Sequence, residues 1–209
     1  YKIKFMSQRK SQIYNLINKP FVYKIIQKVM SGTSFRNNIV KKNITRENLK
    51  ILDIGCGPAE ILEHIPKCEY YGYDIDKRSI KYAKEKYHQK NYHFYCKKFN
   101  KTDVKKLPKF DFIIFFGILH HLNNDEVGMI LNLCKKTMKK KCKLLTEDPI
   151  FIEKQNIFAK FLIKKDRGMN VRKKNEYVDL LKKHFKKVKP QISHQLFIPY
   201  TWFTTICSR

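Results

Sequence analysis

Short apolar runs alternate with stretches of helical periodicity from residue 50 onward. The apolar runs predict strands at 50–54, 69–73, 92–96, 110–116 and 142–147. Between them, apolar positions that recur every three or four residues predict helices at 58–65, 77–88 and 124–138. The side chains expected to face the sheet are Ile80, Ala83, Tyr87, Val127, Ile130, Leu131 and Cys134. This alternation is typical of a doubly wound α/β fold, in which helices cover both faces of a mostly parallel sheet.

Two further regions flank this alternating core. Before it, apolar residues at helical spacing predict two helices that Pro20 separates. After it, the pattern predicts a helical segment at 151–164, a polar loop at 165–172, a helix at 174–185 and strands near 188–195 and 200–207, which bring the sheet to seven strands. No internal repeat or low-complexity linker divides the chain. We therefore expect one domain, with N-terminal helices at 1–45, the core at 46–150 and the final helices and strands at 151–209.

The turn after the first predicted strand has the composition of a ligand-binding loop. In "ILDIGCGPAEIL", residues 51–62, Gly55 and Gly57 lack a Cβ and let the backbone approach a ligand closely. A dinucleotide fingerprint needs a third small residue at position 60, where this chain has Glu60, whose charge would repel a pyrophosphate. The turn therefore favours a ligand without phosphate, and Asp53 at the strand end suits a cationic group on that ligand.

A second carboxylate follows the next predicted strand. The segment "YYGYDID" ends that strand, and Asp74 lies 19 residues after Gly55, a spacing typical of a carboxylate that binds both ribose hydroxyls of a nucleoside. Asp76 is the alternative, although its place before the helix at 77–88 suits an N-cap. Ligands of doubly wound sheets bind beyond the carboxyl ends of the central strands, where both motifs lie. A nucleoside with a cationic group and no phosphate describes S-adenosylmethionine.

Three segments, "LDIGCGPAEIL", "YYGYDIDKRSIKYAKEKY" and "KFDFIIFFGILHHLNNDEVGMIL", follow one another over residues 50–148. In this order and spacing they resemble the class I, Rossmann-like S-adenosylmethionine-dependent methyltransferases. The resemblance implies an enzyme that binds S-adenosylmethionine and releases S-adenosylhomocysteine. It also implies a set of cofactor-binding residues: Asp53, Gly55, Cys56 and Gly57 at the methionine end, Asp74 at the ribose, Ile75 at the adenine, and Phe116 and Gly117 beside the sulfonium.

The residue that meets the adenine amine is left open. The family often has an acidic residue after the third strand, but this chain has "CKKFNKTDV" there. That segment offers Phe99 and Asn100 as cofactor-binding candidates, with Asp103 further along.

The chain from residue 165 onward is the expected acceptor side. The segments "DRGMNVRKKNEYVDLL" and "ISHQLFIPYTWFTTIC" resemble a branch of the superfamily associated with small-molecule and surface-polysaccharide pathways. A guanidinium fork can hold a polar or anionic acceptor in one orientation. We therefore expect a small polar metabolite or sugar-type acceptor, bound by Asp166, Arg167, Arg172 and Tyr200. The alternatives are a solvated charged loop at 165–172, or an internal pair of Asp166 and Arg172 that only fastens the loop to the domain.

Two histidines follow the fourth predicted strand. His120 and His121 lie at the end of the sheet where a base can accept a proton from a hydroxyl or amine acceptor, and His121 is the preferred candidate. The alternative is that one imidazole packs inward and the other bonds to backbone where the next helix starts, after Asn123. A metal held by His121 with Asp125 or Asp148 lacks a convincing ligand set, so no metal is expected.

The net charge of +27 raises the question of a polyanionic partner. Lys and Arg total 45, of which only 7 are Arg, and the Lys residues are spread over every segment. Because phosphate and base recognition favours Arg, we expect a solvated coat with salt-sensitive affinity for polyanions and no specific nucleic acid. A nucleic-acid methyltransferase is one alternative, although "FFGILHH" lacks the Asn/Asp-Pro-Pro-aromatic clamp for a flipped adenine. A non-catalytic module that retains the cofactor fold is the other.

Cysteine content and hydropathy bear on the compartment. The six cysteines form no CxxC pair, and the chain is large enough to need no disulfides, which indicates reduced thiols and a cytoplasmic protein. The longest strongly apolar run, 112–119, is far shorter than a membrane span, so no membrane partner is expected.

Overall fold

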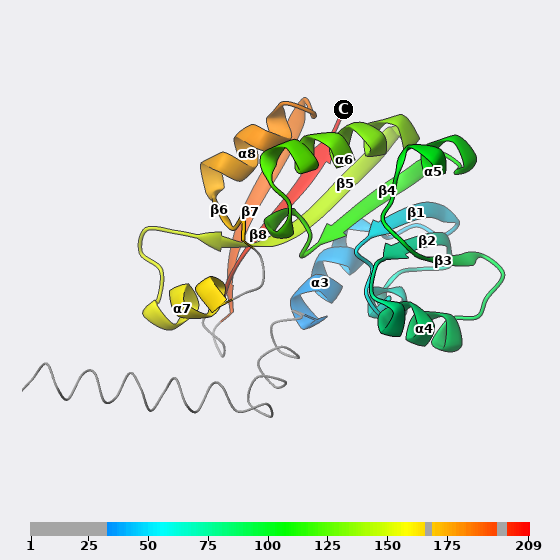
Figure 1. Ribbon diagram of the computed structural model, residues 1–209, viewed down its shortest axis with the longest axis horizontal. Helices are drawn as coiled ribbons and strands as arrows, with labels where there is room; N and C mark the ends of the chain where they lie inside the picture. The colour runs from blue at the N-terminus through cyan, green and yellow to red at the C-terminus, as the bar shows by residue number, and fades with distance from the viewer. Residues whose placement is uncertain (1–32, 166–168, 196–199) are drawn as a thin grey trace, which may run out of the picture. The chain divides into compact units, whose positions relative to one another are not determined.

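In the computed structural model, residues 33–165, 169–195 and 200–209 are described, and they form a sheet with helices on both faces (Figure 1). The chain divides into two units, residues 1–39 and 40–209. The first unit is described only from α3 (Thr33–Asn43) onward. The helices predicted before that point lie outside the described residues, and the expectation of a single domain stays a prediction.

The first half of the second unit builds the parallel part of the sheet. Its elements, in chain order, are β1 (Leu49–Ile54), η1 (Glu60–His64), β2 (Cys68–Asp74), α4 (Lys77–Lys86), β3 (Tyr92–Cys96), α5 (Lys101–Lys106), β4 (Phe110–Phe116), η2 (Leu119–His121) and α6 (Asn124–Thr137). Strands β1, β2, β3 and β4 pair in parallel. The α/β alternation predicted for this region is confirmed, with the bounds of β3 and β4 as predicted.

The second half completes the sheet with both parallel and antiparallel pairings. It consists of β5 (Met138–Phe151), α7 (Ile157–Lys165), β6 (Arg172–Lys173), α8 (Lys174–Lys182), β7 (Lys187–Gln195) and β8 (Tyr200–Ser208). Strand β5 is parallel to β4, whereas β8 runs antiparallel to both β5 and β7. The sheet order is therefore β3-β2-β1-β4-β5-β8-β7, and the order reverses between β1 and β4.

Within the described residues the sheet has eight strands, so the predicted count of seven is corrected. The additional strand is β6, whose two residues pair in parallel with Ile150 and Phe151 of β5. Two residues are too few to produce a periodicity, which is why the hydrophobic pattern does not reveal them. The mostly parallel α/β class is confirmed.

The core lies between the sheet and the helices on its two faces. Figure 1 shows α5, α6 and α8 along one face and α4 on the other. Ile80, Ala83 and Tyr87 are buried as predicted, and so are the residues of α6 predicted to face the sheet, Val127, Leu131 and Cys134. Ile130 is only partly buried, because it lies on the side of α6 that borders a cavity.

Four local elements differ from the sequence pattern. The helix predicted at 151–164 begins only at Ile157, as α7, because β5 continues to Phe151. The helix predicted at 58–65 is only the short 3₁₀ helix η1, which Ala59 precedes in the left-handed conformation, at φ 57°. Helix α5 was not expected, because its six residues are mostly polar and offer no apolar stripe. Strand β5 is longer than the predicted 142–147 run, since its first residues include exposed lysines. Among the described residues, none of the helices combines the length and apolar character needed to span a membrane.

Candidate cofactor and active site

A cavity of about 690 Å³ opens where β1 and β2 end, beside the loops that follow β3 and β4. This is the point at which the strand order reverses, the position where doubly wound sheets bind ligands. Apolar side chains form most of its wall: Ile54, Tyr73, Ile75, Phe99, Ile118, Leu122, Met129, Ile130 and Leu133. Its polar side chains include Asp74, Asn100, His121 and Glu126.

The turn after β1 is held in a conformation that suits glycine. Gly55 has a φ of 76°, and a Cβ built on it would lie 2.0 Å from Cδ1 of Ile118. Gly57 has a φ of 53°, and its N–H donates to Oδ2 of Asp74 at 2.8 Å. The N–H of Gly55 also donates to the carbonyl of Tyr73, at 2.7 Å. The two glycine positions therefore fasten the end of β1 to the end of β2 and keep the cavity wall free of side chains there.

Asp53 and Cys56 lie beneath this turn rather than on the cavity wall. The Asp53 side chain is buried, and the hydroxyl of Tyr70 donates to its Oδ2 at 2.6 Å. Burial and the neighbouring Asp53 raise the pKa of Tyr70, so the phenol stays protonated as a donor. Burial, with Asp53 and Asp74 nearby, also raises the pKa of the Cys56 thiol. Both residues support the turn from inside in this arrangement.

The carboxylate of Asp74 lies in the cavity, and that of Asp76 does not line it. Besides accepting from Gly57, Asp74 accepts the N–H of Asp76 through Oδ1 at 2.8 Å. Asp76 is the N-cap of α4 and accepts the N–H of Ser79 at 3.1 Å. Ile75, between them, lines the cavity with 67% of its surface exposed. The geometry thus favours Asp74 of the two carboxylates left open by the sequence.

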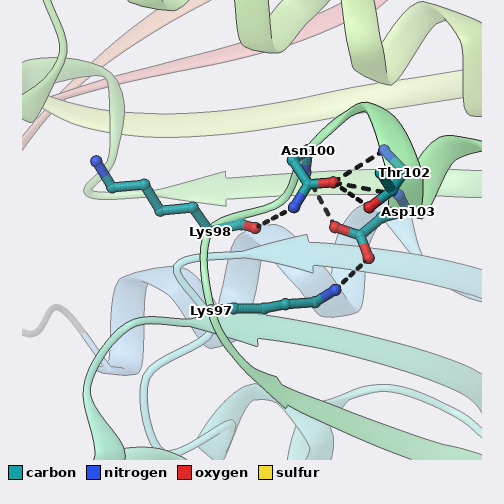
Figure 2. Close-up of polar contacts among 5 residues, drawn as sticks. All are labelled: Lys97, Lys98, Asn100, Thr102 and Asp103. Atoms are coloured by element: carbon teal, nitrogen blue, oxygen red, sulfur yellow. Dashed lines mark hydrogen bonds and ion pairs between the residues drawn. The ribbon is translucent and has the colours of Figure 1, made fainter.

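The loop after β3 ends in a capping box, which Figure 2 shows. Oδ1 of Asn100 accepts the N–H of Thr102 at 2.9 Å, and Oδ2 of Asp103 accepts the N–H of Asn100 at 3.0 Å. The other oxygen of Asp103 binds Nζ of Lys97 at 2.5 Å. Asp103 is buried and fully engaged, so it does not bind a base in the cavity. Phe99 and Asn100 do line the cavity, with the Phe99 ring packed edge-on against Tyr73.

The loop after β4 separates the two histidines. His120 is buried, and its Nδ1 lies 2.8 Å from Oδ1 of Asp148, which also accepts the His120 N–H at 3.1 Å. His121 lines the cavity, with its ring centroid 4.0 Å from that of His120. His120 agrees with the inward half of the alternative considered for this pair, whereas the His121 ring lines the cavity. Because Asp148 holds His120, the geometry leaves His121 as the imidazole that faces the cavity.

Phe116 and Gly117 lie at the end of β4 but are not part of the cavity wall. Phe116 is buried. Gly117 has a φ of 70°, and its N–H donates to the carbonyl of Glu147 at 2.7 Å. Within the described residues, no group of three His, Cys, Asp or Glu side chains is placed to hold a metal ion.

Arg172 is buried and uses all five of its N–H donors inside the protein. Its guanidinium bonds to three backbone carbonyls and twice to the side chain of Asn124: Leu119 O at 2.8 Å, Asn170 O at 3.0 Å, Leu122 O at 2.7 Å, and Asn124 Oδ1 at 3.0 and 2.9 Å. It also lies over the Tyr177 ring, 5.6 Å from the centroid. With these bonds Arg172 fastens the loop after β4 to the segment before α8, and acceptor binding by its fork stays a prediction. The predicted internal partner, Asp166, lies outside the described residues.

The other residues predicted for the acceptor side are not placed. Asp166 and Arg167 lie outside the described residues. Tyr200 begins β8, but its side chain lies outside what the structure describes.

Comparison with known proteins identifies the family. Residues 45–198 match the family described as "Methyltransferase domain", which is well over half of the chain. The chain belongs to the S-adenosylmethionine-dependent methyltransferases. No curated protein matches the sequence significantly.

Solved structures share the fold of this methyltransferase at low sequence identity. A SAM-dependent methyltransferase from Archaeoglobus fulgidus is 16% identical, with a TM-score of 0.64 over 91% of this chain and all of that chain. One from Aquifex aeolicus is 18% identical, with a TM-score of 0.59 over 82% of this chain and 88% of that one. The plantazolicin methyltransferase BamL, solved with a triazolic desmethylPZN analog and SAH, is 16% identical, with a TM-score of 0.63 over 94% of each chain.

The residues of the cavity fit the cofactor of this family, S-adenosylmethionine. The volume lies within the roughly 300–1,000 Å³ of small-molecule and cofactor sites. Apolar walls suit an adenine ring, and a carboxylate at the end of β2 suits a ribose. When bound, the cofactor supplies an electrophilic methyl group on a cationic sulfonium. The methyltransferase itself needs to orient that group and exclude water from it.

Sequence reasoning missed the contribution of α6 to the cavity. Met129 is 61% exposed, and Ile130 and Leu133 lie beside it on the cavity wall. The sequence did carry a signal for these residues, because the apolar positions of α6 cover a wider arc of the helix surface than a single stripe facing the sheet would. Lys98 and Lys101 also line the cavity. The sequence does not single them out, because lysine is abundant everywhere in the chain.

Proposed function

We propose that this methyltransferase transfers the methyl group of S-adenosylmethionine to a small polar acceptor and releases S-adenosylhomocysteine. The observation that carries the proposal is the cavity at the reversal of strand order, with Asp74 inside it. The likeness to the plantazolicin methyltransferase, over 94% of each chain, supports a small-molecule acceptor.

The proposed cofactor contacts follow the strand ends. Asp74 accepts the ribose hydroxyls, since its carboxylate is already fixed by two backbone N–H groups and needs no reorganisation. Ile75 packs against the adenine, and Phe99 and Asn100 border the same end of the cavity. The methionine end lies along Gly55 and Gly57, which Asp53 and Cys56 support from beneath. Phe116 and Gly117 set the backbone beside the sulfonium.

His121 is the proposed base for an acceptor that must lose a proton. Its imidazole lies on the cavity wall, and the loop that carries it is fixed by Arg172 through the carbonyls of Leu119 and Leu122. His120, held by Asp148, positions this loop from inside. Methyl transfer is an in-line displacement at carbon, so orientation contributes to the rate even where no base is required.

The acceptor side is proposed at the segment around Asp166 and Arg167 and at Tyr200. This segment directly precedes Asn170, whose N–H donates to the carbonyl of His120 at 2.9 Å. That bond brings the chain after α7 to the loop that carries His121. A sugar derivative or a small acid is the acceptor class that Asp and Arg side chains would recognise there.

The test is a comparison of small molecules in a cell extract incubated with the enzyme and S-adenosylmethionine. Mass spectrometry should show at least one small polar compound heavier by one methylene unit, with S-adenosylhomocysteine formed in equal amount. The Asp74→Ala protein serves as the matched control and, at a limiting concentration of S-adenosylmethionine, should form both products at least tenfold more slowly. If the extract yields methylated polynucleotide instead, or cofactor binds without turnover on any acceptor, the proposal is wrong.

A further inference from the structure

A basic groove lies at the end of the sheet remote from the cofactor cavity. Its volume is about 1330 Å³, and it lies between the C-terminal ends of α6 and α8, where β4 and β5 begin. Strand β4 has seven residues, and at roughly 3.3 Å per residue it separates the groove from the loop of His121 by about 20 Å. The groove is therefore a separate site from the one that transfers methyl groups.

Cations dominate the wall of this groove. Seven of its eleven lining residues are Lys or Arg, and among the described residues that line it none is Asp or Glu. They come from four parts of the chain: the end of α6, the end of α8, the residue before β4, and Arg209. Lysines that look evenly scattered in the sequence are thus gathered by the fold.

Only part of this charge is used within the protein. Nζ of Lys109 donates to the carbonyl of Lys136, and Arg209 donates to that of Lys135, so these two cations cap the C-terminal end of α6. Lys183 and Lys186 enter no ion pair with a carboxylate among the described residues, and neither does Lys135. Their charges face the groove without a negative partner there.

A histidine in the groove experiences this positive field. His184 is half-buried, and its Nδ1 lies 3.2 Å from Oδ1 of Asn132. Burial lowers the pKa of His184, and the charges of Lys135 and Lys183 lower it further. An anion placed in the groove would offset these charges, so this imidazole is a natural reporter of occupancy.

We propose that the groove binds the phosphate backbone of a single-stranded nucleic acid. Its volume exceeds the roughly 300–1,000 Å³ of small-molecule sites, which favours an extended chain over one small anion. A flexible strand can follow a concave surface, whereas a bilayer is flat and a duplex is stiff over about 50 nm. Point charges from Lys bind phosphates without reading bases, so the binding is independent of sequence. The bound strand holds the enzyme on a polyanion and is not itself methylated.

The test compares a variant that lacks three positive charges of the groove with a control variant that lacks three positive charges elsewhere. The groove variant carries Lys135→Gln, Lys183→Gln and Lys186→Gln, and the control carries Lys77→Gln, Lys84→Gln and Lys90→Gln on and after α4. All six side chains are at least partly exposed, so both variants should keep the wild-type melting temperature. The probe is fluorescein-labelled oligouridylate of about 12 nucleotides, a length within the usual range for single-strand grooves, with anisotropy followed over a salt series.

The groove variant should bind at least tenfold more weakly at low salt. Its plot of log affinity against log salt should be shallower by about 2, because each lost phosphate contact on a single strand removes roughly 0.7 from the slope. The control should change affinity less than threefold. Equal weakening of both variants would mean a diffuse coat and would overturn the proposal.

Two further measurements identify the occupant. Oligouridylate should raise the pKa of His184 in an NMR titration, because its phosphates offset the charges of Lys135 and Lys183. Vesicles of phosphatidylserine and phosphatidylcholine should compete poorly with the oligonucleotide. If the groove variant loses vesicle binding but keeps oligouridylate binding, or if His184 does not respond, the single-strand assignment is wrong.

Discussion

Asp74 illustrates how one side chain serves both structure and ligand. Its two oxygens accept N–H groups from Gly57 and Asp76, so the carboxylate is oriented before any ligand arrives. Fixing a charged acceptor in this way lowers the reorganisation needed on binding. Asp53, one strand away, is bonded to Tyr70 and buried instead. Two carboxylates that look equivalent at strand ends thus have different roles.

Asp74→Ala should weaken both S-adenosylmethionine and S-adenosylhomocysteine by a similar factor, because the ribose is common to the two ligands. Losing a charge-assisted partner costs about 1.5–3 kcal/mol, which is tenfold or more in Kd. Isothermal titration calorimetry measures both affinities. Asp76→Ala is the matched control and should leave them nearly unchanged. Unaltered affinity in Asp74→Ala would move the ribose contact elsewhere.

Arg172→Lys should destabilise the fold, because Lys has three donors and no planar fork to replace five buried hydrogen bonds. The expected loss is about 1.5–3 kcal/mol in the free energy of unfolding. Urea denaturation measures this loss, and Arg78→Lys, at an exposed position of α4, is the control. Turnover should fall in step with stability. A variant with wild-type stability and a raised KM would return Arg172 to the acceptor site.

The two substitutions His121→Ala and His120→Ala should have different effects, the first on turnover and the second on stability. His121→Ala should lower kcat by about 10²–10⁴ for an acceptor that loses a proton, with an unchanged melting temperature. His120→Ala should lower stability by about 1–3 kcal/mol, because it removes the buried bond to Asp148. If kcat of His121→Ala stays within threefold of wild type for such an acceptor, another group acts as the base.

At the level of elements, capping determines where the cavity loops end. Asp76 starts α4 and Asn100 starts α5, each by accepting backbone N–H groups of the first turn. Only Asn100 lies on the cavity wall, and its box with Asp103 fixes the loop that carries Phe99. The short helix α5 is therefore important mainly as an anchor for that loop.

Asn100→Ala should reduce both stability and cofactor affinity. Loss of an N-cap costs about 0.5–2 kcal/mol. Because the loop from Lys97 to Asn100 borders the cavity, its loosening should also raise the Kd for S-adenosylhomocysteine about tenfold. Asp76→Ala removes a comparable cap from α4 and is the control. It should lower the stability by a similar amount and leave the Kd for S-adenosylhomocysteine unchanged. Differential scanning fluorimetry with and without ligand reports both effects.

At the level of the whole molecule, the fold places the cofactor cavity and the basic groove at opposite ends of the sheet. The cofactor cavity lies where the parallel strands end, and the basic groove lies where β4 and β5 begin. The Lys and Arg residues behind the net charge of +27 therefore form both a solvated coat and a local cluster of cations in the groove.

Polynucleotide binding should be strong at low salt, collapse toward physiological salt and show no sequence preference. Methyl incorporation into RNA or DNA should stay at background at either salt concentration, because the groove and the cavity lie at different ends of β4. Filter binding after incubation with radiolabelled S-adenosylmethionine measures this. Label that enters polynucleotide at turnover rates would overturn the small-molecule function.

The sequence by itself determined the α/β class, the bounds of β3 and β4, and the cofactor motif. These features are local, since a strand run and a glycine turn are each encoded within a few residues, and the carboxylate follows the turn at a fixed spacing of 19 residues. It did not reveal β6, whose two residues have no periodicity and exist only because β5 is beside them. It also missed α5, which is held by a capping box rather than by an apolar stripe.

Tertiary structure alone decided which polar side chains face a ligand and which face the protein. The sequence only slightly preferred His121 to His120 as the base, and it could not show that His120 bonds to Asp148 or that Arg172 bonds to carbonyls around residues 119–124. It presented Lys135, Lys183 and Arg209 as members of an even distribution, although they line one groove. The physical reason is the same in each case: burial and hydrogen bonding depend on neighbours distant in the chain, and only the packed fold brings those neighbours together.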